Sequence, residues 1–444
     1  MRSALSLPSV TSDLSQLGFL LFVSALVAML TRRLRMPYTV GLVLAGMGLY
    51  ILQVHIKWHL SKELIFSVFL PPLVFEAALF VSWREFKMEL PVLAILATVG
   101  VLLAAAATAI GMHFVLRWDW WSAIVFGVLI AATDPVSVIA VFKESGVRGR
   151  LRLLIEAESL LNDGTAAVAF VAVLGIFSGN HAGVLSIASA LLFTILGGAL
   201  IGGVVACIFM FLAGRTPDYL VEITFTTLAA YGAFSIAEHF RCSGVLATLT
   251  AGLVVGNFRS SALIADAGRR PLESFWEYLA HIGDSLVLLL VGTAQKQQQD
   301  TDSFTLLSNT ARQVLEPFWE YVAFIANSLI FLLIGAQVAE QHFSVLWVPV
   351  FVAIVLVTLG RAISIYPLCA MFARSRLKVP RRHQHILFWG GLRGALALAL
   401  ALALPEELPR HDDIVTITFA VVAFSVFAQG LTITPLLRRL GQVK

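Results

Sequence analysis

Charged residues are scarce in this chain of 444 residues. Only 13% of the residues are charged, whereas a typical soluble protein carries about 25%. Hydrophobic residues make up 59% of the sequence, and the mean hydropathy is +0.88. Apolar stretches of roughly 18 or more residues, long enough to cross the hydrocarbon of a bilayer, recur almost to the C-terminus. These observations exclude a soluble globule and predict a polytopic protein whose main partner is the lipid bilayer.

Cysteines are also few, at Cys207, Cys242 and Cys369. They lack the spacing of metal ligands, so the sequence predicts neither a disulfide framework nor a zinc site. The chain also lacks a nucleotide-binding motif and a nucleophile elbow, so we expect no nucleotide, no cofactor and no enzyme. The net charge of +4 comes from short basic clusters between apolar segments, a placement that membrane topology explains better than nucleic-acid binding does.

The predicted membrane spans are helices, because lipid offers no hydrogen-bond partners to an open backbone. The first span is followed by three arginines and has no convincing cleavage site, so we interpret it as a helix and not as a signal peptide. The apolar segments lie at residues 14–31, 37–54, 63–81, 91–115, 119–142, 152–177, 182–213, 219–239, 242–257, 274–294, 317–339, 345–373, 384–403 and 412–437.

Basic residues alternate from loop to loop, and the loops that carry them are predicted to be cytoplasmic. The intervening loops are short and poor in Lys and Arg, which places the N-terminus outside and the C-terminus in the cytoplasm. The basic loops contain Arg32, Arg33, Arg35, Arg84, Lys87, Lys143, Arg148, Arg150, Arg152, Arg215, Arg259, Arg269, Arg270, Arg374, Arg376, Lys378, Arg381 and Arg382.

The alternation fails once, between the basic loops at Arg270 and Arg374, where three apolar segments stand and an even number of crossings is required. The sequence Phe-Trp-Glu-Tyr occurs twice there, at residues 275–278 and 318–321, which indicates a helix duplicated in tandem. We predict that the second copy spans the membrane. The first copy, roughly residues 271–313, is then an insertion that is interfacial, re-entrant, poorly ordered or an artefact of sequence assembly.

Ionisable residues inside predicted spans are few, and each is a candidate functional residue because a charge in hydrocarbon costs several kcal/mol. They are Glu76, Asp134, Glu156, Glu158, Asp163, Arg361 and Arg393, with Glu222 and Glu238 nearer to segment ends.

Asp134 lies in the middle of the 119–142 segment and is followed by Pro135. The proline ring cannot donate a backbone hydrogen bond and disrupts the preceding turn, so we expect the helix to break near Thr133. Such a break frees carbonyl oxygens that can bind a small cation where it lines a cavity. The alternative interpretation is an ordinary proline kink.

The next predicted helix places oxygen-bearing side chains on one side. Glu158 and Asn162 are four residues apart, as are Ser159 and Asp163, so each pair shares a helix face. The rise of about 1.5 Å per residue puts them near the middle of the bilayer. This set of hard oxygen ligands suits an alkali cation, and its carboxylate can hold a proton instead. Glu156, closer to the cytoplasm, is predicted to lie in a funnel or at a solvated end.

Glycines and an arginine at residues 390–394 interrupt the 384–403 segment. Two discontinuous helices in corresponding halves are typical of secondary transporters with inverted repeats. Without the duplicated helix about 13 transmembrane helices remain, and we assign the first repeat to 14–177, a linking helix to 182–213 and the second repeat to 219–437, all in one domain of residues 1–444. Arg361 requires an anionic partner, and Glu158 is the best one available. The alternative for Arg361 is a snorkelling side chain.

These motifs resemble those of monovalent cation/proton antiporters, most of all the NhaP and NHE sodium/proton exchangers. The resemblance rests on Thr133-Asp134-Pro135, on residues 158–164 and 390–394, and on the Pro-Pro-Leu-Val-Phe-Glu stretch that ends at Glu76. It implies the NhaA-like, all-α fold of inverted six-helix repeats, in which the two discontinuous helices cross at midplane. It also implies a homodimer in which a six-helix core moves relative to a panel domain.

The resemblance further implies a role for each site residue. Asp163 is the carboxylate that binds the ion and the proton, Asn162 is its neighbour, and Ser159 with the backbone of Thr133 helps to coordinate Na⁺. In the same resemblance Glu158 is grouped with the ion site and pairs with Arg361, Asp134 and Arg393 stabilise the crossing, and Glu76 lies near the cation path.

The implied function is electroneutral exchange of Na⁺ or Li⁺ for a proton by alternating access, in the inner (plasma) membrane. An Asn followed by an Asp, at Asn162 and Asp163, goes with one-for-one exchange in that family. Potassium/proton exchange and a passive cation channel stay open as alternatives. An intramembrane aspartyl protease would need a Gly-x-Gly-Asp motif, and the nearest stretch, residues 281–284, begins with His.

Overall fold

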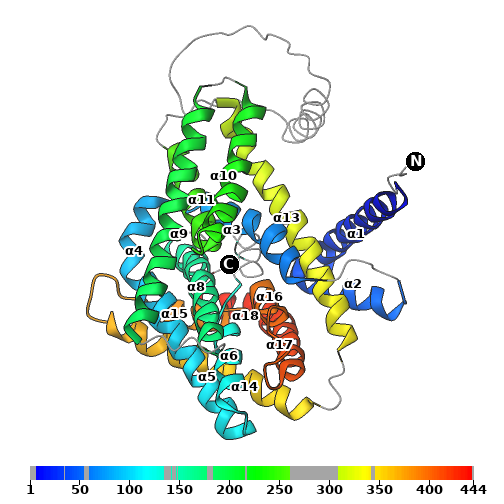
Figure 1. Cartoon of the computed structure of the whole chain (residues 1–444), viewed down its shortest axis with the longest axis vertical. Coiled ribbons are helices and arrows are strands. Elements are labelled where there is room, and N and C mark those ends of the chain that lie inside the picture. The colour runs from blue at the N-terminus through cyan, green and yellow to red at the C-terminus, as the bar shows by residue number, and fades with distance from the viewer. Residues whose placement is uncertain are drawn as a thin grey trace. The chain divides into compact units, whose positions relative to one another are not determined.

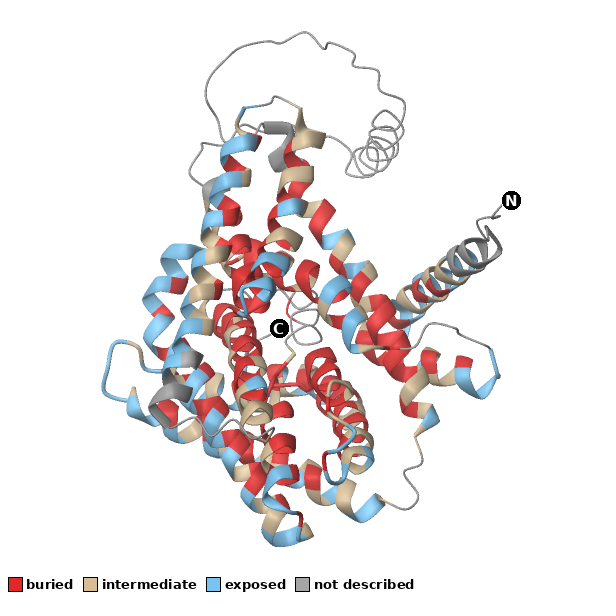
Figure 2. Ribbon diagram, in the orientation of Figure 1, coloured by how far each residue is buried: buried red, intermediate tan, exposed pale blue. Residues whose placement is uncertain are grey.

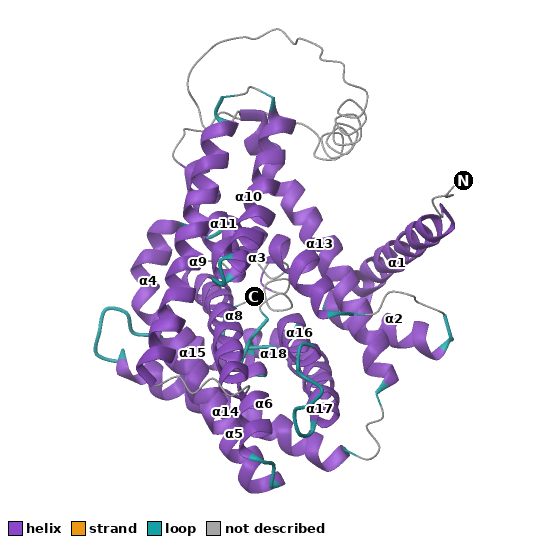
Figure 3. Ribbon diagram, in the orientation of Figure 1, coloured by secondary structure: helices purple, strands orange, loops and turns teal. Residues whose placement is uncertain are grey.

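The regular structure of this chain is helical throughout the part that its computed structural model describes (Figure 3). The described residues are 7–34, 36–54, 60–134, 142, 147, 149–177, 184–215, 218–260, 309–341 and 346–442. The helices, labelled in Figure 1, are α1 (Leu7–Leu34), α2 (Tyr38–Ile51), η1 (Leu64–Phe69), α3 (Leu70–Leu79), α4 (Trp83–Ile95), η2 (Leu96–Gly100), α5 (Val101–Leu116), α6 (Trp120–Leu129), α8 (Arg150–Phe177), α9 (Val184–Ala213), α10 (Tyr219–His239), α11 (Gly244–Ser260), α13 (Asn309–Glu340), α14 (Trp347–Met371), α15 (Arg381–Trp389), α16 (Ala395–Leu402), α17 (His411–Phe424), η3 (Ser425–Gln429) and α18 (Gly430–Arg439).

Eight helices in the described residues are long and apolar enough to cross a membrane, and four shorter apolar helices accompany them. Two of the long ones are continuous across π-helical turns, namely residues 83–116 through η2 and residues 411–439 through η3. The predicted class, an all-α polytopic membrane protein, is confirmed.

Several helix ends differ from the predicted spans because hydropathy detects the lipid-facing part of a helix and not its polar turns. The segment predicted at 91–115 begins at Trp83, and its first turns carry charged side chains such as Arg84 and Glu85. The span predicted at 384–403 likewise begins at Arg381. The predicted span 63–81 contains a π-helical turn, η1, followed by α3.

The chain forms two compact units. The first contains residues 1–69, 85–191 and 325–444, and the second contains residues 70–84 and 192–324. In the first unit α5 packs against α6 and α14, and α16 packs against α17. The helix α16 consists of alanine and leucine alone, and its residues from Ala395 to Ala401 are all buried (Figure 2). A helix that is apolar all round and buried belongs to the protein interior and not to the lipid boundary.

The second unit has an alanine-rich core in which α10 and α11 pack closely. The indole of Trp319 is fully buried there, and its Nε1–H donates to the Oγ1 of Thr226 over 3.2 Å. The ring centroids of Trp319 and Phe75 lie 4.5 Å apart. Trp319 belongs to the second copy of the duplicated motif, which forms part of α13. Residues 271–308 of the predicted insertion lie outside the described residues, and 309–313 begin α13.

In the first unit, α2 and the second half of α13 touch through small residues. A Cβ added at Gly46 would collide with the carbonyl oxygen of Leu332 and lie 3.0 Å from the Cα of Gly335. Small residues at such contacts let helix backbones approach closely, which is a main source of helix association in membranes. Beside this contact the Tyr38 hydroxyl lies 2.6 Å from the Ser328 hydroxyl.

We predict that Gly46→Ala destabilises the protein by about 1–3 kcal/mol, because the added methyl group overpacks this contact. Gly48, on the same helix, has no neighbouring atom within 4 Å of an added Cβ. Gly48→Ala is therefore the matched control, and it should leave stability unchanged or raise it by up to about 1 kcal/mol. Thermal unfolding of the purified proteins in detergent measures the stability change of each variant. Equal shifts for the two variants would contradict the close contact.

Candidate ion-binding site

The helix that is predicted to break near Thr133 begins at a well-formed cap and ends early. Asp119 caps α6 by accepting a hydrogen bond from the Ser122 backbone over 2.9 Å, as expected for an aspartate in that position. The helix ends at Leu129, a few residues before the break predicted near Thr133. Pro135 follows the extended stretch, and a residue that precedes proline is biased away from helical geometry. The chain therefore runs non-helically through Thr133 to Asp134.

The second interrupted helix consists of α15, which ends at Trp389, and α16, which begins at Ala395. Between them, residues 390–394 contain three glycines. A Cβ added at Gly391 would lie 2.6 Å from the Nε of Arg361, and one at Gly394 would collide with the Asp134 carboxylate. These positions therefore require glycine because charged side chains approach the backbone closely.

The two extended stretches cross each other in the first unit. The Asp134 N–H donates to the carbonyl oxygen of Leu392 over 2.7 Å, forming an antiparallel bridge. The Arg393 Nη1 donates to the carbonyl oxygens of Ala131 and Ala132 over 2.8 and 2.9 Å. Arg393 thus satisfies carbonyls at the C-terminal end of α6, while the Asp134 carboxylate lies against Gly394 at the N-terminal end of α16. A positive charge is favourable at the C-terminal end of a helix and a negative charge at the N-terminal end, so both side chains stabilise the helix ends that they contact.

The oxygen-bearing face of α8 meets this crossing at Thr133. The amide nitrogen of Asn162 donates to the Thr133 hydroxyl over 3.0 Å, and that hydroxyl donates to the Ser159 hydroxyl over 3.3 Å. The Asp163 carboxylate interacts with the backbone N–H of Thr133. The structure therefore brings together four of the residues that the sequence assigns to ion binding.

Two oxygen atoms at this place have no hydrogen-bond partner among the residues that the structure describes. They are the Oδ1 of Asn162 and the Oδ1 of Asp163, and both atoms are buried. Buried polar atoms are nearly always satisfied, so such exceptions call for a missing partner. A cation that has lost its hydration shell is one partner that this amide oxygen and this carboxylate oxygen can bind together.

Glu158 and Arg361 form a buried ion pair. The Arg361 Nη1 and Nη2 donate to the two carboxylate oxygens of Glu158 over 2.8 and 2.9 Å, and Nη2 also donates to the Leu387 carbonyl over 3.1 Å. Both side chains are at least 94% buried. A bidentate arginine–carboxylate pair is the strong form of this interaction. Snorkelling of Arg361 to a helix end is excluded by this geometry.

Glu156 is a correction to the sequence analysis. It was predicted to lie in a funnel or at a solvated end, but its side chain is only 7% exposed and pairs with the Arg152 Nε over 2.6 Å. The i, i+4 spacing places the two side chains on one face of α8. Glu76 lies in α3, in the second unit, and its place near the cation path stays a prediction.

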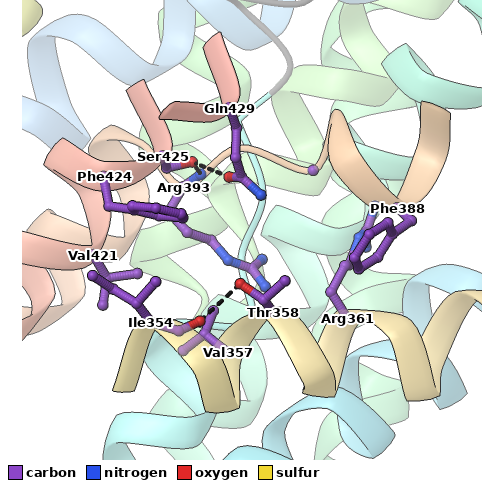
Figure 4. Close-up of a pocket in the computed structure, with 11 residues that line it drawn as sticks. Ile354, Val357, Thr358, Arg361, Phe388, Arg393, Val421, Phe424, Ser425 and Gln429 are labelled. Carbon is purple, nitrogen blue, oxygen red and sulfur yellow. Dashed lines mark hydrogen bonds between the residues drawn. The ribbon is translucent and has the colours of Figure 1, made fainter. Parts of the chain in front are cut away.

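Two polar residues that the sequence analysis did not single out are linked to the crossing, because Ser425 accepts from the Arg393 backbone and donates to Gln429. Ser425 and Gln429 belong to η3, and both are buried. They line a cavity in the first unit together with Arg393 and Thr358 (Figure 4). Serine and glutamine carry no charge, so the search for intramembrane ionisable residues could not find them.

Discontinuous helices that meet at a cluster of oxygen ligands define the architecture of a secondary transporter. The sequence model of the transmembrane sodium/hydrogen exchanger family matches residues 19–296 and 287–439 of the chain. The two matched segments overlap within the duplicated region. The chain therefore belongs to the sodium/hydrogen exchanger family.

Curated relatives and solved structures agree with this assignment. The Na⁺/H⁺ antiporter ApNhaP of Aphanothece halophytica is 34% identical over 100% of this chain and 78% of its own length. The Na⁺/H⁺ antiporter NhaH of Halobacillus dabanensis is 30% identical over 96% of this chain and 98% of its own length. A structure of the sodium proton antiporter MjNhaP1 from Methanocaldococcus jannaschii matches 97% of this chain and 99% of that chain, with a TM-score of 0.67 and 18% identity. At that identity the structural match supports the fold.

We predict that breaking the buried ion pair on one side destabilises the protein strongly. Glu158→Gln or Arg361→Met leaves an uncompensated buried charge and should each cost about 3–5 kcal/mol. The double variant should be more stable than either single variant, because neither charge is then left alone. Asp413→Asn is the control, since its pair with Arg410 is exposed and should contribute less than about 1 kcal/mol. Thermal unfolding of the parent, the two single variants and the double variant measures these changes in stability. If the loss in the double variant equalled the sum of the two single losses, a direct interaction between the two side chains would be contradicted.

Proposed function

We propose that this chain exchanges Na⁺ or Li⁺ for a proton across the membrane, one for one, and that Asp163 carries both ions in turn. The observation that supports the proposal best is the pair of buried, unpartnered oxygens on Asn162 and Asp163. They lie beside the Thr133 and Ser159 hydroxyls, at the place where two interrupted helices meet. Curated relatives that match almost the whole chain are Na⁺/H⁺ antiporters.

The mechanism is competition at one carboxylate. A protonated Asp163 is a poor cation ligand, and a bound cation expels the proton because both neutralise the same buried charge. Only the loaded forms, with a proton or with a cation, then move between inward-facing and outward-facing states. The empty form, in which Asp163 is charged and unpaired, does not change between these states, because an uncompensated buried carboxylate costs free energy in a low dielectric. Exchange follows from this rule.

The one-for-one ratio follows from the neighbours of Asp163. Glu158 is engaged by two nitrogens of Arg361, so its charge is already compensated by a protein side chain. Asn162 contributes an amide in place of a second carboxylate. Within this set Asp163 is the one carboxylate whose charge changes in the cycle.

The crossing residues have supporting roles in this proposal. Arg393 and Asp134 hold the two extended stretches at the ends of α6 and α16. Thr133 and Ser159 supply oxygens to the cation, and Glu76 lies on the path by which cations arrive. Transport needs no cofactor and no chemical catalysis. We place the protein in the plasma membrane as a homodimer, with the N-terminus outside and the C-terminus in the cytoplasm.

We predict that Asp163→Asn abolishes cation-induced proton movement. In everted membrane vesicles that carry an acid interior, addition of Na⁺ or Li⁺ should release protons with the parent protein and not with Asp163→Asn. Asp412→Asn, which changes an exposed aspartate on α17, is the control and should behave as the parent does. Immunoblots establish equal amounts in the membrane. Equal proton release by the parent and by Asp163→Asn would remove Asp163 from the mechanism.

The same vesicles rank the cations and distinguish the alternatives. A larger response to K⁺ than to Na⁺ would indicate potassium/proton exchange at the same site. A passive channel would carry Na⁺ without coupled proton movement.

Competition at a single carboxylate also predicts the pH dependence. As the pH falls below the pKa of the site, the apparent KM for Na⁺ should rise about tenfold for each unit, because one proton competes with one cation. Initial rates measured over a range of Na⁺ concentrations at several pH values test this slope. A KM that does not vary with pH would show that the proton and the cation use separate sites.

A further inference from the structure

The last long helix is widened at one place by a π-helical turn, η3, between α17 and α18. Its first and last residues are Ser425 and Gln429, which are 1% and 7% exposed. Their immediate neighbours, Phe424, Val426, Ala428 and Gly430, carry no polar side chain. Single π-helical turns of this kind occur frequently at functional sites.

Ser425 connects this turn to the crossing. Its Oγ accepts a hydrogen bond from the backbone N–H of Arg393 over 2.8 Å, and its hydroxyl donates to the Oε1 of Gln429 over 2.8 Å. Because the hydroxyl proton is committed to Gln429, a lone pair of Oγ faces Arg393. Gln429 therefore orients Ser425, and Ser425 holds the backbone of Arg393.

A chain of contacts then leads from Ser425 to the ion site. The Arg393 guanidinium donates to the Ala131 and Ala132 carbonyls, directly before Thr133. Thr133 in turn contacts Ser159, Asn162 and Asp163. The position of the Arg393 backbone thus determines where the guanidinium lies and where the extended stretch before Thr133 is held.

A cavity lies beside Arg393 and Ser425 (Figure 4). It has room for about one water molecule and is lined by Arg393, Thr358, Phe388, Val421, Ser425 and Gln429. Within the described residues, the Nε of Arg361, which also lines the cavity, has no hydrogen-bond partner. Close packing normally restrains a buried side chain, and the cavity removes part of that restraint beside Arg393. The hydrogen bond from Arg393 to Ser425 therefore carries a larger share of the positioning.

We propose that Ser425, oriented by Gln429, is a positioning residue of the cation site that acts through Arg393. This inference rests on the proposed function, because it assigns Ser425 to the affinity for the transported cation. Loss of the hydroxyl lets the Arg393 backbone shift toward the cavity, and the oxygens around Thr133 lose the geometry that favours a bound cation.

The experiment compares variants at these two positions with a matched control in the same vesicle assay. Ser425→Ala removes both hydrogen bonds, and Gln429→Met removes the acceptor that orients Ser425. Ser425→Thr keeps the hydroxyl and adds a methyl group to a residue that lines the cavity. Thr418→Val is the control, since Thr418 is buried on the same long helix and its hydroxyl bonds only to the Ile414 carbonyl of its own helix.

Ser425→Ala should raise the apparent KM for Na⁺ by about three- to tenfold, the effect expected from the loss of one net hydrogen bond, with the maximal rate within about twofold of the parent. Gln429→Met should change KM in the same direction by a smaller factor. Ser425→Thr should restore the parent value, and Thr418→Val should leave it unchanged. A general weakening of the fold would instead lower the maximal rate and the midpoint of thermal unfolding without this selective change in KM.

Each outcome separates the inference from the proposed function. If the parent exchanges Na⁺ for protons and Ser425→Ala has the same KM as Thr418→Val, the inference is wrong and the proposed function stands. If the parent shows no exchange, the proposed function fails, and the inference fails with it. If Ser425→Ala does not fold, Gln429→Met carries the test, and an unchanged KM for that variant overturns the proposal.

Discussion

The backbone hydrogen bond from Asp134 to Leu392 joins the extended stretch after α6 to the break between α15 and α16. Each of these non-helical stretches leaves carbonyl and N–H groups that have no partner in lipid, so neither is tolerable alone. Where the two stretches cross, the N–H of Asp134 donates to the carbonyl of Leu392. The Arg393 guanidinium donates to a carbonyl after α6, and the Asp134 carboxylate lies at the start of α16. This crossing leaves polar groups at a buried position where a continuous helix would leave none, and the proposed ion site is built from them.

Buried charge is the second constraint on this structure. Glu158, Asp163, Arg361 and Arg393 all lie in the interior of the first unit. Pairing neutralises Glu158 and Arg361, and the freed carbonyls engage Arg393. The carboxylate of Asp163 has one oxygen, Oδ1, without a hydrogen-bond partner among the described residues. In the proposed mechanism the transported ion neutralises this carboxylate.

Much of this site could be predicted from the sequence because its signals are strong and local. Pro135 and the glycines at 390–394 disrupt helices by their covalent structure, and charged residues inside apolar segments stand out. The pairing of Glu158 with Arg361 was an inference from charge balance, and the structure has that pair.

Other features depend on packing that the sequence does not display. The exit of the chain from α6 at Leu129 precedes the proline by several residues, because the crossing and not the proline alone ends the helix. Ser425 and Gln429 are uncharged, and their importance arises from a π-helical turn that hydropathy cannot detect. Glu156 looked like a solvated residue because pairing with Arg152 within one helix turn does not change the hydropathy of the segment.

The central claim is that one carboxylate binds either a proton or a cation, and the most direct test measures both on the purified protein. In weakly buffered detergent solution containing a pH indicator, saturating NaCl should release about one proton per chain from protein equilibrated below the pKa of the site. Choline chloride should release none, and Asp163→Asn should release none with either salt. Stabilisation of the protein by Na⁺ without any release of protons would contradict a shared site.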